Sequence, residues 1–507
     1  MNVAVTLIDQ RFPKTDYGIL ERKVYEMKFL LKAIYTFAIA QLLTPIGYAN
    51  DYNNRFISEK SPVIAFTGAR VIDGTGASVK EKHTVIIRDG RIIKIGKDGK
   101  VIIPKDARRI SLKGKSLLPG WVMTHEHLWY ITRPGAAEDK NPSYSKDYWY
   151  GTGANGFRIA TPQPVSYPRL YLAHGVTTAR TAGSRFVEED LRIRNAIDGG
   201  IQVGPDFDTG PTIYKAKGPD DARSRVRFWA KQGATSVKVY SSLSKESTAA
   251  AIDEAHRLNL KISGHLCSVT YREAVDMGID QIQHGFLVVG TDLVANKTPG
   301  KCELPDTVKE HSQLVRQGGE KIRELFQHII KHDVSMSSTP IVLFRPELPS
   351  HVVDFFNESG LRDYKLFRKM WEKDAETSER FLAEQITRLD VAFWRSGGKL
   401  TLGSDAAGTG VMAGYSNLKS LEILTEYGIP PLEVIKIATH NGAESLGVLE
   451  DRGTIEVGRR ADLLVIKGDP SKDIKDIYNI ETVFKKGIGY DPEALKKSAI
   501  GTIGGPG

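Results

Sequence analysis

Two histidines separated by one residue stand at the end of an apolar run, where they could hold a metal ion. His125 and His127 follow residues 117–123, which read Leu-Leu-Pro-Gly-Trp-Val-Met. In a β-strand, alternate side chains point to the same face, so both imidazoles would project together and Glu126 would point away. Imidazoles are common ligands of zinc. The motif therefore predicts part of a metal site at the end of a strand.

Further residues with metal-ligand chemistry stand at the ends of other short apolar runs. Each run is followed by a stretch with helical character, as in a barrel of alternating strands and helices. The C-terminal ends of the strands converge on one face of such a barrel, where active sites of this architecture lie. The pattern predicts that the two histidines meet four distant residues there: Lys238, His265, His284 and Asp405.

Several residues near these strand ends are candidates for substrate contact. Tyr240 lies two residues beyond Lys238 on the same strand, and both a substrate contact and buried aromatic packing fit that position. Three weaker candidates are Arg180, Tyr214 and Lys215.

Each predicted ligand also has an interpretation that involves no metal. A single His-x-His motif is a weak signal, and a lone lysine on a strand is usually solvated. His265 and His284 would also fit as hydrogen-bonded core residues, and Asp405 as a helix cap before a glycine-rich turn. The occurrence of all these residues in one chain favours the metal site, because five separate strand ends carry suitable residue types.

The elements that position these residues read as alternating strands and helices over residues 118–448. Helical stretches at residues 220–232, 245–257 and 271–277 separate the short apolar runs. This alternation is typical of a parallel sheet and predicts a (β/α)8 TIM barrel, which makes the fold class α/β.

Short strands with turn signals flank the barrel region on both sides. Residues 63–117 contain five short apolar runs and an Asp89-Gly90 hairpin signal, and residues 449–491 contain two more runs. We expect a small β-sandwich domain built from both ends of the mature chain, with the barrel enclosed between its halves in sequence.

The N-terminal segment reads as a targeting signal. Met27 begins a basic start, an apolar stretch covers residues 33–43, and Ala49 ends a small-residue cleavage pattern. We interpret residues 1–26 as an over-extended start and residues 27–49 as a cleavable signal peptide, which predicts a periplasmic or secreted protein. An uncleaved amphipathic helix is the alternative. No cysteine directly follows the apolar stretch, which argues against a lipid anchor. We therefore expect no stable membrane anchor.

The amino-acid composition limits the classes of molecule that the protein is expected to bind. The chain has 507 residues and a formal net charge of +9, with lysine and arginine spread among acidic residues. The lack of a dense basic run argues against nucleic-acid binding, so we expect a small-molecule partner. The two cysteines, Cys267 and Cys302, allow one disulfide in an exported protein but no disulfide framework.

With these motifs in this order, residues 64–491 resemble the amidohydrolase superfamily, in the imidazolonepropionase-like and prolidase-like branch of binuclear type. Segments 175–178 and 453–463 resemble the same branch. The resemblance implies two divalent metal ions, with zinc expected and manganese, cobalt or iron as alternatives. The implied ligands are His125, His127 and Asp405 for the buried ion, His265 and His284 for the exposed ion, and carboxylated Lys238 as the bridge. Glu126 departs from the pattern, because a less acidic residue is expected there.

The resemblance also implies hydrolysis of a carbon–nitrogen bond in an amide, cyclic amide or N-acyl substrate. A metal-activated hydroxide would attack, and catalytic Asp405 would accept a proton and pass it to the departing amine. An Xaa-Pro-type dipeptidase is one alternative, and a lyase or phosphoester hydrolase would use the same ligands. A non-catalytic binding module is the remaining alternative, ranked last because no ligand is missing.

Overall fold

The computed structural model describes residues 52–132, 159–294, 297–298, 300–304, 308–374 and 379–505. The described residues from Phe56 onward form one compact unit, which contains every element discussed below. The predicted signal peptide at residues 27–49 and the segment before it lie outside the described residues. Among the helices that the structure describes, none is both long and apolar enough to cross a membrane.

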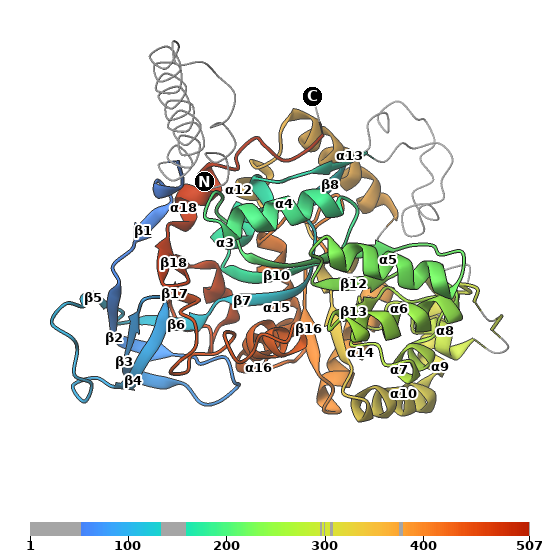
Figure 1. The fold of residues 1–507 in the computed structure, drawn as a ribbon, viewed down its shortest axis with the longest axis horizontal. Helices are drawn as coiled ribbons and strands as arrows, with labels where there is room; N and C mark the ends of the chain where they lie inside the picture. The colour runs from blue at the N-terminus through green and yellow to red at the C-terminus, as the bar shows by residue number, and fades with distance from the viewer. Residues whose placement is uncertain are drawn as a thin grey trace, which may run out of the picture. The chain divides into compact units, whose positions relative to one another are not determined.

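Eight parallel strands form a nearly closed barrel with helices around it (Figure 1). Neighbouring strands pair in sequence order from β7 to β16. Helices cover the outside of the barrel and bury the outer faces of the strands. For example, β10 is buried along its whole length. The barrel strands are β7 (Trp121–Glu126), β10 (Val176–Ser184), β11 (Asp206–Ile213), β12 (Ser236–Val239), β13 (Lys261–Gly264), β14 (Gln281–Gln283), β15 (Ser335–Ser338) and β16 (Leu400–Leu402).

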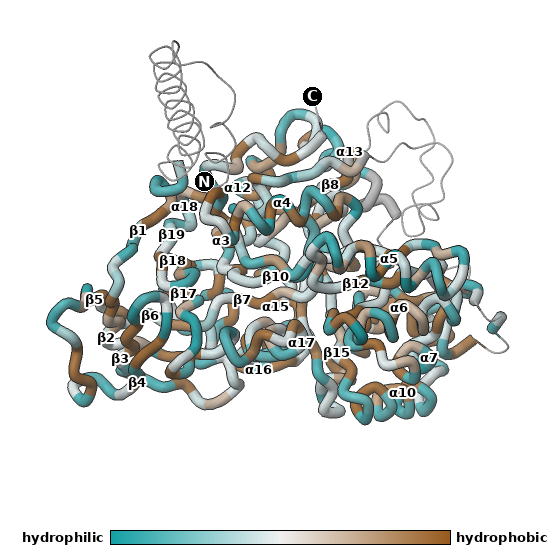
Figure 2. Tube along the Cα trace, viewed as in Figure 1, coloured by the Kyte–Doolittle hydropathy of each residue, from teal (hydrophilic) through white to brown (hydrophobic). Residues whose placement is uncertain are grey.

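Helices connect the barrel strands and begin where the sequence offers caps. Ser244 accepts a hydrogen bond from Ser247 N at the start of α6, and Thr270 forms a capping box with Glu273 at the start of α7. Amphipathic helices such as α10 alternate apolar and polar residues along the tube in Figure 2. The helices are α3 (Ser166–Ala173), α4 (Val187–Asp198), α5 (Pro219–Lys231), α6 (Lys245–Arg257), α7 (Tyr271–Asp276), α8 (Gly290–Leu293), α9 (Val308–Gln317), α10 (Gly319–Lys331), α11 (Pro340–Phe344), α12 (Ser350–Val353), α13 (Glu358–Asp374), α14 (Glu379–Arg395), α15 (Tyr415–Glu426), α16 (Pro431–Lys436), the π-helix η1 (Ile437–Asn441) and α17 (Gly442–Ser445).

Strands from both ends of the chain form a separate nine-stranded mixed sheet in the order β1-β19-β18-β17-β6-β2-β3-β4, with β5 paired to β2. Three strand spacings, about 14 Å in a flat sheet, separate β2 from β18. The rings of Phe66 and Phe484 nevertheless lie 5.0 Å apart, so the sheet folds over a core of its own. Its strands are β1 (Ile57–Glu59), β2 (Val63–Val71), β3 (Lys80–Arg88), β4 (Arg91–Lys97), β5 (Arg108–Ser111), β6 (Lys115–Pro119), β17 (Leu463–Lys467), β18 (Ile480–Lys485) and β19 (Ile488–Tyr490).

The predicted fold class is confirmed, because the chain combines a parallel eight-stranded barrel with a separate sheet from its two ends. The two parts are joined directly, since only Gly120 stands between β6 and β7, and its amide donates to Asp462 O at 2.9 Å. The remaining elements are the β8 (Trp129–Thr132) and β9 (Ile159–Pro162) hairpin, the 3-10 helix η2 (Ile474–Tyr478) and α18 (Pro492–Lys497).

The barrel closes between its first and last strands. In the described part of the chain, no strand ladder joins β7 to β16. Asp405 N instead donates to His125 O at 2.9 Å, and Thr124 Oγ1 bonds Thr401 Oγ1 at 2.8 Å. This junction, called the seam below and formed by residues 124–126 and 401–405, contains two of the predicted ligands, His125 and Asp405. A third, His127, directly follows it.

Candidate metal centre

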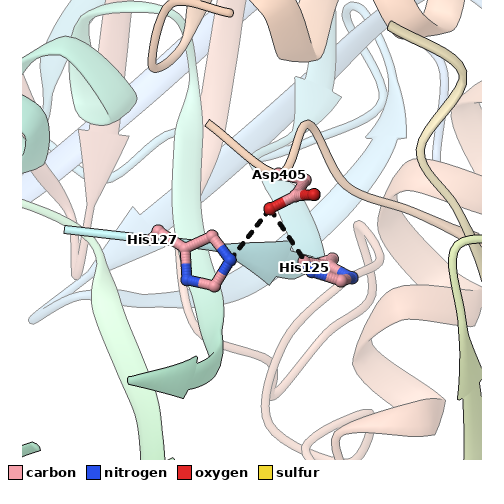
Figure 3. A group of neighbouring side chains, drawn as sticks. All are labelled: His125, His127 and Asp405. Atoms are coloured by element: carbon pink, nitrogen blue, oxygen red, sulfur yellow. Dashed lines mark ion pairs between the residues drawn. The ribbon is translucent and has the colours of Figure 1, made fainter. Parts of the chain in front are cut away.

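The six residues predicted as metal ligands come together at the C-terminal end of the barrel. Asp405 follows β16 and faces His125 of β7 and His127 just beyond it, as Figure 3 shows. Its Oδ1 lies 2.8 Å from His127 Nε2 and 3.6 Å from His125 Nε2. These three side chains form the first part of the cluster.

Residues from β12, β13 and β14 complete the cluster. Lys238 Nζ lies 3.3 Å from His125 Nε2. The ring centroid of His284 lies 4.3 Å from that of His125 and 4.5 Å from that of His265. The structure therefore brings all six predicted residues together, while their role as ligands stays a prediction.

The first part of the cluster fits a divalent transition-metal ion. His125, His127 and Asp405 each offer a ligand atom, and these atoms lie within 4.8 Å of one another. The Nδ1 atoms of both histidines are buried and have no hydrogen-bond partner among the described residues. Two imidazoles and a carboxylate are a donor set that zinc accepts, so the residues present fit the predicted ion.

Burial keeps the histidines of the cluster neutral at physiological pH. It holds the pKa of His125 and His284 well below the usual value and lowers the pKa of His265 to about 3. A neutral imidazole retains the lone pair that a metal ion requires. Burial also lowers the pKa of Lys238 to about 8, which increases its fraction of neutral amine. Burial therefore favours the neutral forms of these histidines and of Lys238, which are the forms that can serve a metal site.

Asp405 is an ionised carboxylate on a strained backbone. Burial alone would raise its pKa, but His125 and His127 hold that pKa well below the usual range. The φ of Asp405 is +50° and that of His284 is +68°, both in the left-handed region that non-glycine residues rarely adopt. Such strain persists at functional sites only where neighbouring contacts impose it. The backbones of these two residues must therefore be held in place by their surroundings.

Comparison with known proteins decides the family. The model of the Amidohydrolase family matches residues 170–488, more than half of the chain. The chain belongs to the amidohydrolase family. Four predicted ligands lie within the matched residues, namely Lys238, His265, His284 and Asp405, and His125 and His127 precede the match. No curated protein matches the chain in sequence.

Solved structures that this amidohydrolase is similar to include several hydrolases. A Xaa-Pro dipeptidase with bound methionine has 18% identity and a TM-score of 0.60, covering 85% of this chain and 100% of that chain. Molinate hydrolase has 17% identity and a TM-score of 0.62, covering 89% and 99%. Ochratoxinase from A. niger has 19% identity and a TM-score of 0.58, covering 85% and 96%. At these identities the likeness shows the fold alone.

Five residues of the cluster line a cavity of about 590 Å³: His127, Lys238, His265, His284 and Asp405. Tyr240 lies on the wall of this cavity, with its ring centroid 4.7 Å from that of His265, and its contact with substrate stays a prediction. Tyr214 and Lys215 also line the cavity. Arg180 does not line it, because its Nε instead donates to Asp208 Oδ2 at 2.6 Å.

The cavity wall has apolar and cationic parts. Ile131, Leu287 and Val342 contribute apolar surface, whereas Arg185 and Lys215 contribute positive charge. A ligand that matches this wall has an apolar portion and an anionic group. These side chains come from the β8–β9 hairpin, from loops and from α11, all beyond the barrel strand ends, and such segments usually decide substrate choice in barrels.

Glu126 points away from the cluster, as the strand alternation predicted, and its partners lie across the seam. Its carboxylate accepts hydrogen bonds from Ser404 N at 2.8 Å and from Asn417 Nδ2 at 2.6 Å. Burial raises the pKa of Glu126 to about 7. Ser404 and Asn417 were not identified from the sequence as partners of Glu126. The unusual acidic residue at position 126 was the one sign in the sequence that such partners are needed.

Cys267 lies two residues beyond His265 and forms a disulfide with Cys302, with the Cα atoms 4.7 Å apart. This is the one bridge that the sequence allows. It ties the loop after β13 to the segment at residues 300–304, on the side of the barrel where the cluster lies.

Proposed function

We propose that this amidohydrolase cleaves a carbon–nitrogen bond in a small amide or N-acyl substrate with the help of two divalent metal ions. The observation that carries the proposal is the meeting of residues from five strand ends at one cavity, where Asp405 Oδ1 lies 2.8 Å from His127 Nε2. A site made only for packing would not gather neutral imidazoles around an ionised carboxylate beside an open cavity.

The chemistry of each side chain supports a specific ligand assignment. We assign His125, His127 and Asp405 to one ion, His265 and His284 to the other, and Lys238 to a bridge after it adds carbon dioxide. The lowered pKa of Lys238, about 8, supports the neutral amine that this addition needs. Zinc is the expected ion, and manganese, cobalt and iron accept the same ligands.

The residues of the cavity have separate roles in the proposed reaction. When bound, the ions would activate a water molecule and polarise the scissile carbonyl. Asp405 would take up the proton released on attack and deliver it to the departing amine. Tyr240 would orient the substrate from the wall beside His265.

The cavity wall supports a substrate with a free carboxylate. Arg185 and Lys215 would attract that group, and the apolar part of the wall would receive an acyl or side-chain portion. An N-acyl amino acid or a dipeptide meets both requirements, whereas a neutral lactam leaves the cationic part unused. The similar Xaa-Pro dipeptidase structure makes a dipeptide with C-terminal proline the second candidate.

We further propose that the protein is exported to the periplasm or the medium. The Cys267–Cys302 disulfide supports this location, since disulfides persist mainly in oxidising compartments. N-terminal sequencing of protein recovered from its native compartment tests the proposal. A chain that begins at Asn50 is expected, and a cytosolic chain that retains the upstream residues would contradict it.

A hydrolysis screen with metal analysis of the same preparation tests the function. The panel contains N-acyl amino acids, Xaa-Pro and other dipeptides, and lactams. We expect cleavage of N-acyl amino acids or dipeptides. This activity should be lost after chelation of the metal and recovered when zinc is added. The His125→Ala variant should lose both metal and activity. A metal-free wild-type preparation with no hydrolysis of any class would contradict the proposal and favour a binding module.

A further inference from the structure

The two sides of the seam approach closely and are joined by one main-chain hydrogen bond and by side-chain hydrogen bonds rather than by a strand ladder. A Cβ atom on Gly403 would lie 2.5 Å from both His125 O and His125 Cβ, so only glycine fits between β16 and the predicted ligand strand. Beyond Gly403, the main chain leaves β16 and turns at Asp405, whose φ is +50°. The amides of this turn need acceptors from β7.

The carboxylate of Glu126 provides one of these acceptors in place of a main-chain carbonyl. Ser404 N donates to Glu126 Oε1 at 2.8 Å, and Ser404 Oγ donates to the other carboxylate oxygen. Asn417 Nδ2, from α15, donates to Oε1 at 2.6 Å. Glu126 is fully buried, and donors from Ser404, Asn417 and Tyr171 surround its carboxyl group.

The residue held in this way directly precedes Asp405. Asp405 N donates to His125 O at 2.9 Å, so consecutive amides of the turn bond to consecutive residues of β7. One acceptor is a carbonyl and the other is the side chain of Glu126. Together they fix the left-handed turn that directs the Asp405 carboxylate toward His127.

We propose that Glu126 is a positioning residue that closes the barrel seam and thereby sets the orientation of Asp405 toward His125 and His127. This inference rests on the proposed function in one respect, since Asp405 is taken there as a metal ligand. Without Glu126, the amide and hydroxyl of Ser404 lose their acceptor and the turn relaxes. The two histidines would remain in place, because His125 belongs to β7 and the carbonyl of His127 accepts a hydrogen bond from Tyr171 at 2.9 Å.

A purely structural role for Glu126 makes a different prediction. In that case, loss of its hydrogen bonds would lower stability without a specific effect on metal binding. Asp292 provides a matched control, because its carboxylate is also largely buried and accepts the amides of Tyr271 at 2.9 Å and Arg272 at 3.0 Å. These bonds lie at the start of α7 and involve no predicted ligand.

The test compares Glu126→Ala, Glu126→Gln and Asp292→Ala in the full chain, with zinc affinity measured by chelator competition. Glutamine keeps an acceptor for Ser404 N and Asn417, and its amide can donate to Ser404 Oγ. We expect Glu126→Ala to weaken zinc binding by about 10- to 100-fold, as loss of supporting partners does at other metal sites. Glu126→Gln should bind within a few-fold of wild type, and Asp292→Ala should match wild type. Equal zinc affinity in Glu126→Ala and wild type would overturn the proposal.

Hydrogen exchange in the metal-free protein separates this inference from the proposed function. We expect the amides of residues 403–406 to exchange at least about tenfold faster in Glu126→Ala than in wild type, while β10 and β11 stay protected. That result supports the positioning role even if the wild type hydrolyses no tested amide. Unchanged exchange at residues 403–406 would overturn it, whatever the enzyme assays show.

Discussion

Two largely buried aspartates, one at each end of the barrel, have contrasting surroundings. Asp206 begins β11, and its carboxylate lies 2.6 Å from Arg452 and Arg460 and 2.7 Å from Lys485. Asp405 follows β16 and faces histidines. Burial alone would raise the pKa of Asp206, and the charges of Lys485 and Arg460 hold it well below the usual range. Both carboxylates are therefore ionised, but for different reasons.

These surroundings distinguish the end of the barrel that stabilises the fold, at Asp206, from the end that carries the candidate metal site, at Asp405. Arginine and lysine keep their protons at neutral pH, so Asp206 has permanent counter-charges and joins the barrel to β18 and the segment before β17. Neutral imidazoles give Asp405 no permanent counter-charge and keep lone pairs for a metal ion. A cation from solution would complete the second arrangement, whereas the first is already complete. Barrel enzymes divide their ends in the same way.

The largest expected effect on activity comes from Asp405→Asn. The amide cannot carry the proton to the departing amine, and loss of a general acid–base typically costs about 10²- to 10⁴-fold in rate. The free energy of unfolding of the metal-free protein should change less than in Asp206→Asn, because the imidazoles around Asp405 are neutral and burial lowers the pKa of Lys238, the nearby amine, to about 8. Turnover and urea unfolding of the same preparations measure both quantities. An active variant with strongly reduced stability would reverse the assignment of the two aspartates.

Asp206→Asn should produce the opposite result. Removing its charge leaves the buried Lys485 without its ion-pair partner, whereas Arg452 and Arg460 keep Asp451 and Asp462. Loss of one partner of a buried ion pair costs about 3–5 kcal/mol in the free energy of unfolding. Turnover per folded molecule should stay within about twofold of wild type, since the cluster lies at the other end of the strands. Urea unfolding and active-site titration measure the two quantities. Unchanged stability would show that Asp206 does not join the sheet to the barrel.

The contribution of Asp206 to stability should depend on pH in a defined direction. An unfolded aspartate has a pKa of about 3.9, and the folded pKa lies well below that value. The contribution is therefore complete above the unfolded pKa and is lost as pH falls toward the folded pKa. The stability difference between wild type and Asp206→Asn should be constant above about pH 5 and should shrink below about pH 4. A difference that is as large at pH 3 as at pH 7 would contradict this origin.

The smallest expected effects concern the cationic cavity wall. Arg185→Met and Lys215→Met should each raise KM for an anionic substrate by a few-fold, because an exposed charge contributes only about 0.2–1 kcal/mol. KM for a neutral amide of similar size should not change. Assays at low and high salt provide the control, since screening should reduce the effect for the anionic substrate alone. Equal effects on both substrates would indicate packing rather than charge recognition.

The sequence predicts those features that depend on local pattern. The helix expected at residues 245–257 coincides with α6, whose start is capped by Ser244. The ligand candidates could be chosen because each lies at or just beyond the end of a short strand, and barrel geometry brings such ends together. The helix expected at residues 220–232 is observed as α5 (Pro219–Lys231). It begins one residue earlier because proline suits the first turn of a helix.

The sequence could not indicate contacts made across long distances in the chain. Glu126 and Ser404 are separated by 278 positions, so nothing local reveals their hydrogen bond. Arg180 illustrates the same limit, because its side chain was a candidate for substrate contact and instead bonds Asp208 and Gln281. The left-handed backbones of His284 and Asp405 are also imposed by neighbours rather than by residue type.

Anomalous diffraction at the zinc edge, from crystals of the full chain grown with zinc, tests the two-ion site most directly. We predict two peaks at the C-terminal end of the barrel: one within coordination distance of His125, His127 and Asp405, and one beside His265 and His284. Density for a carboxylated Lys238 should lie between them. Fully loaded crystals with no peak near His125 and His127 would contradict the account.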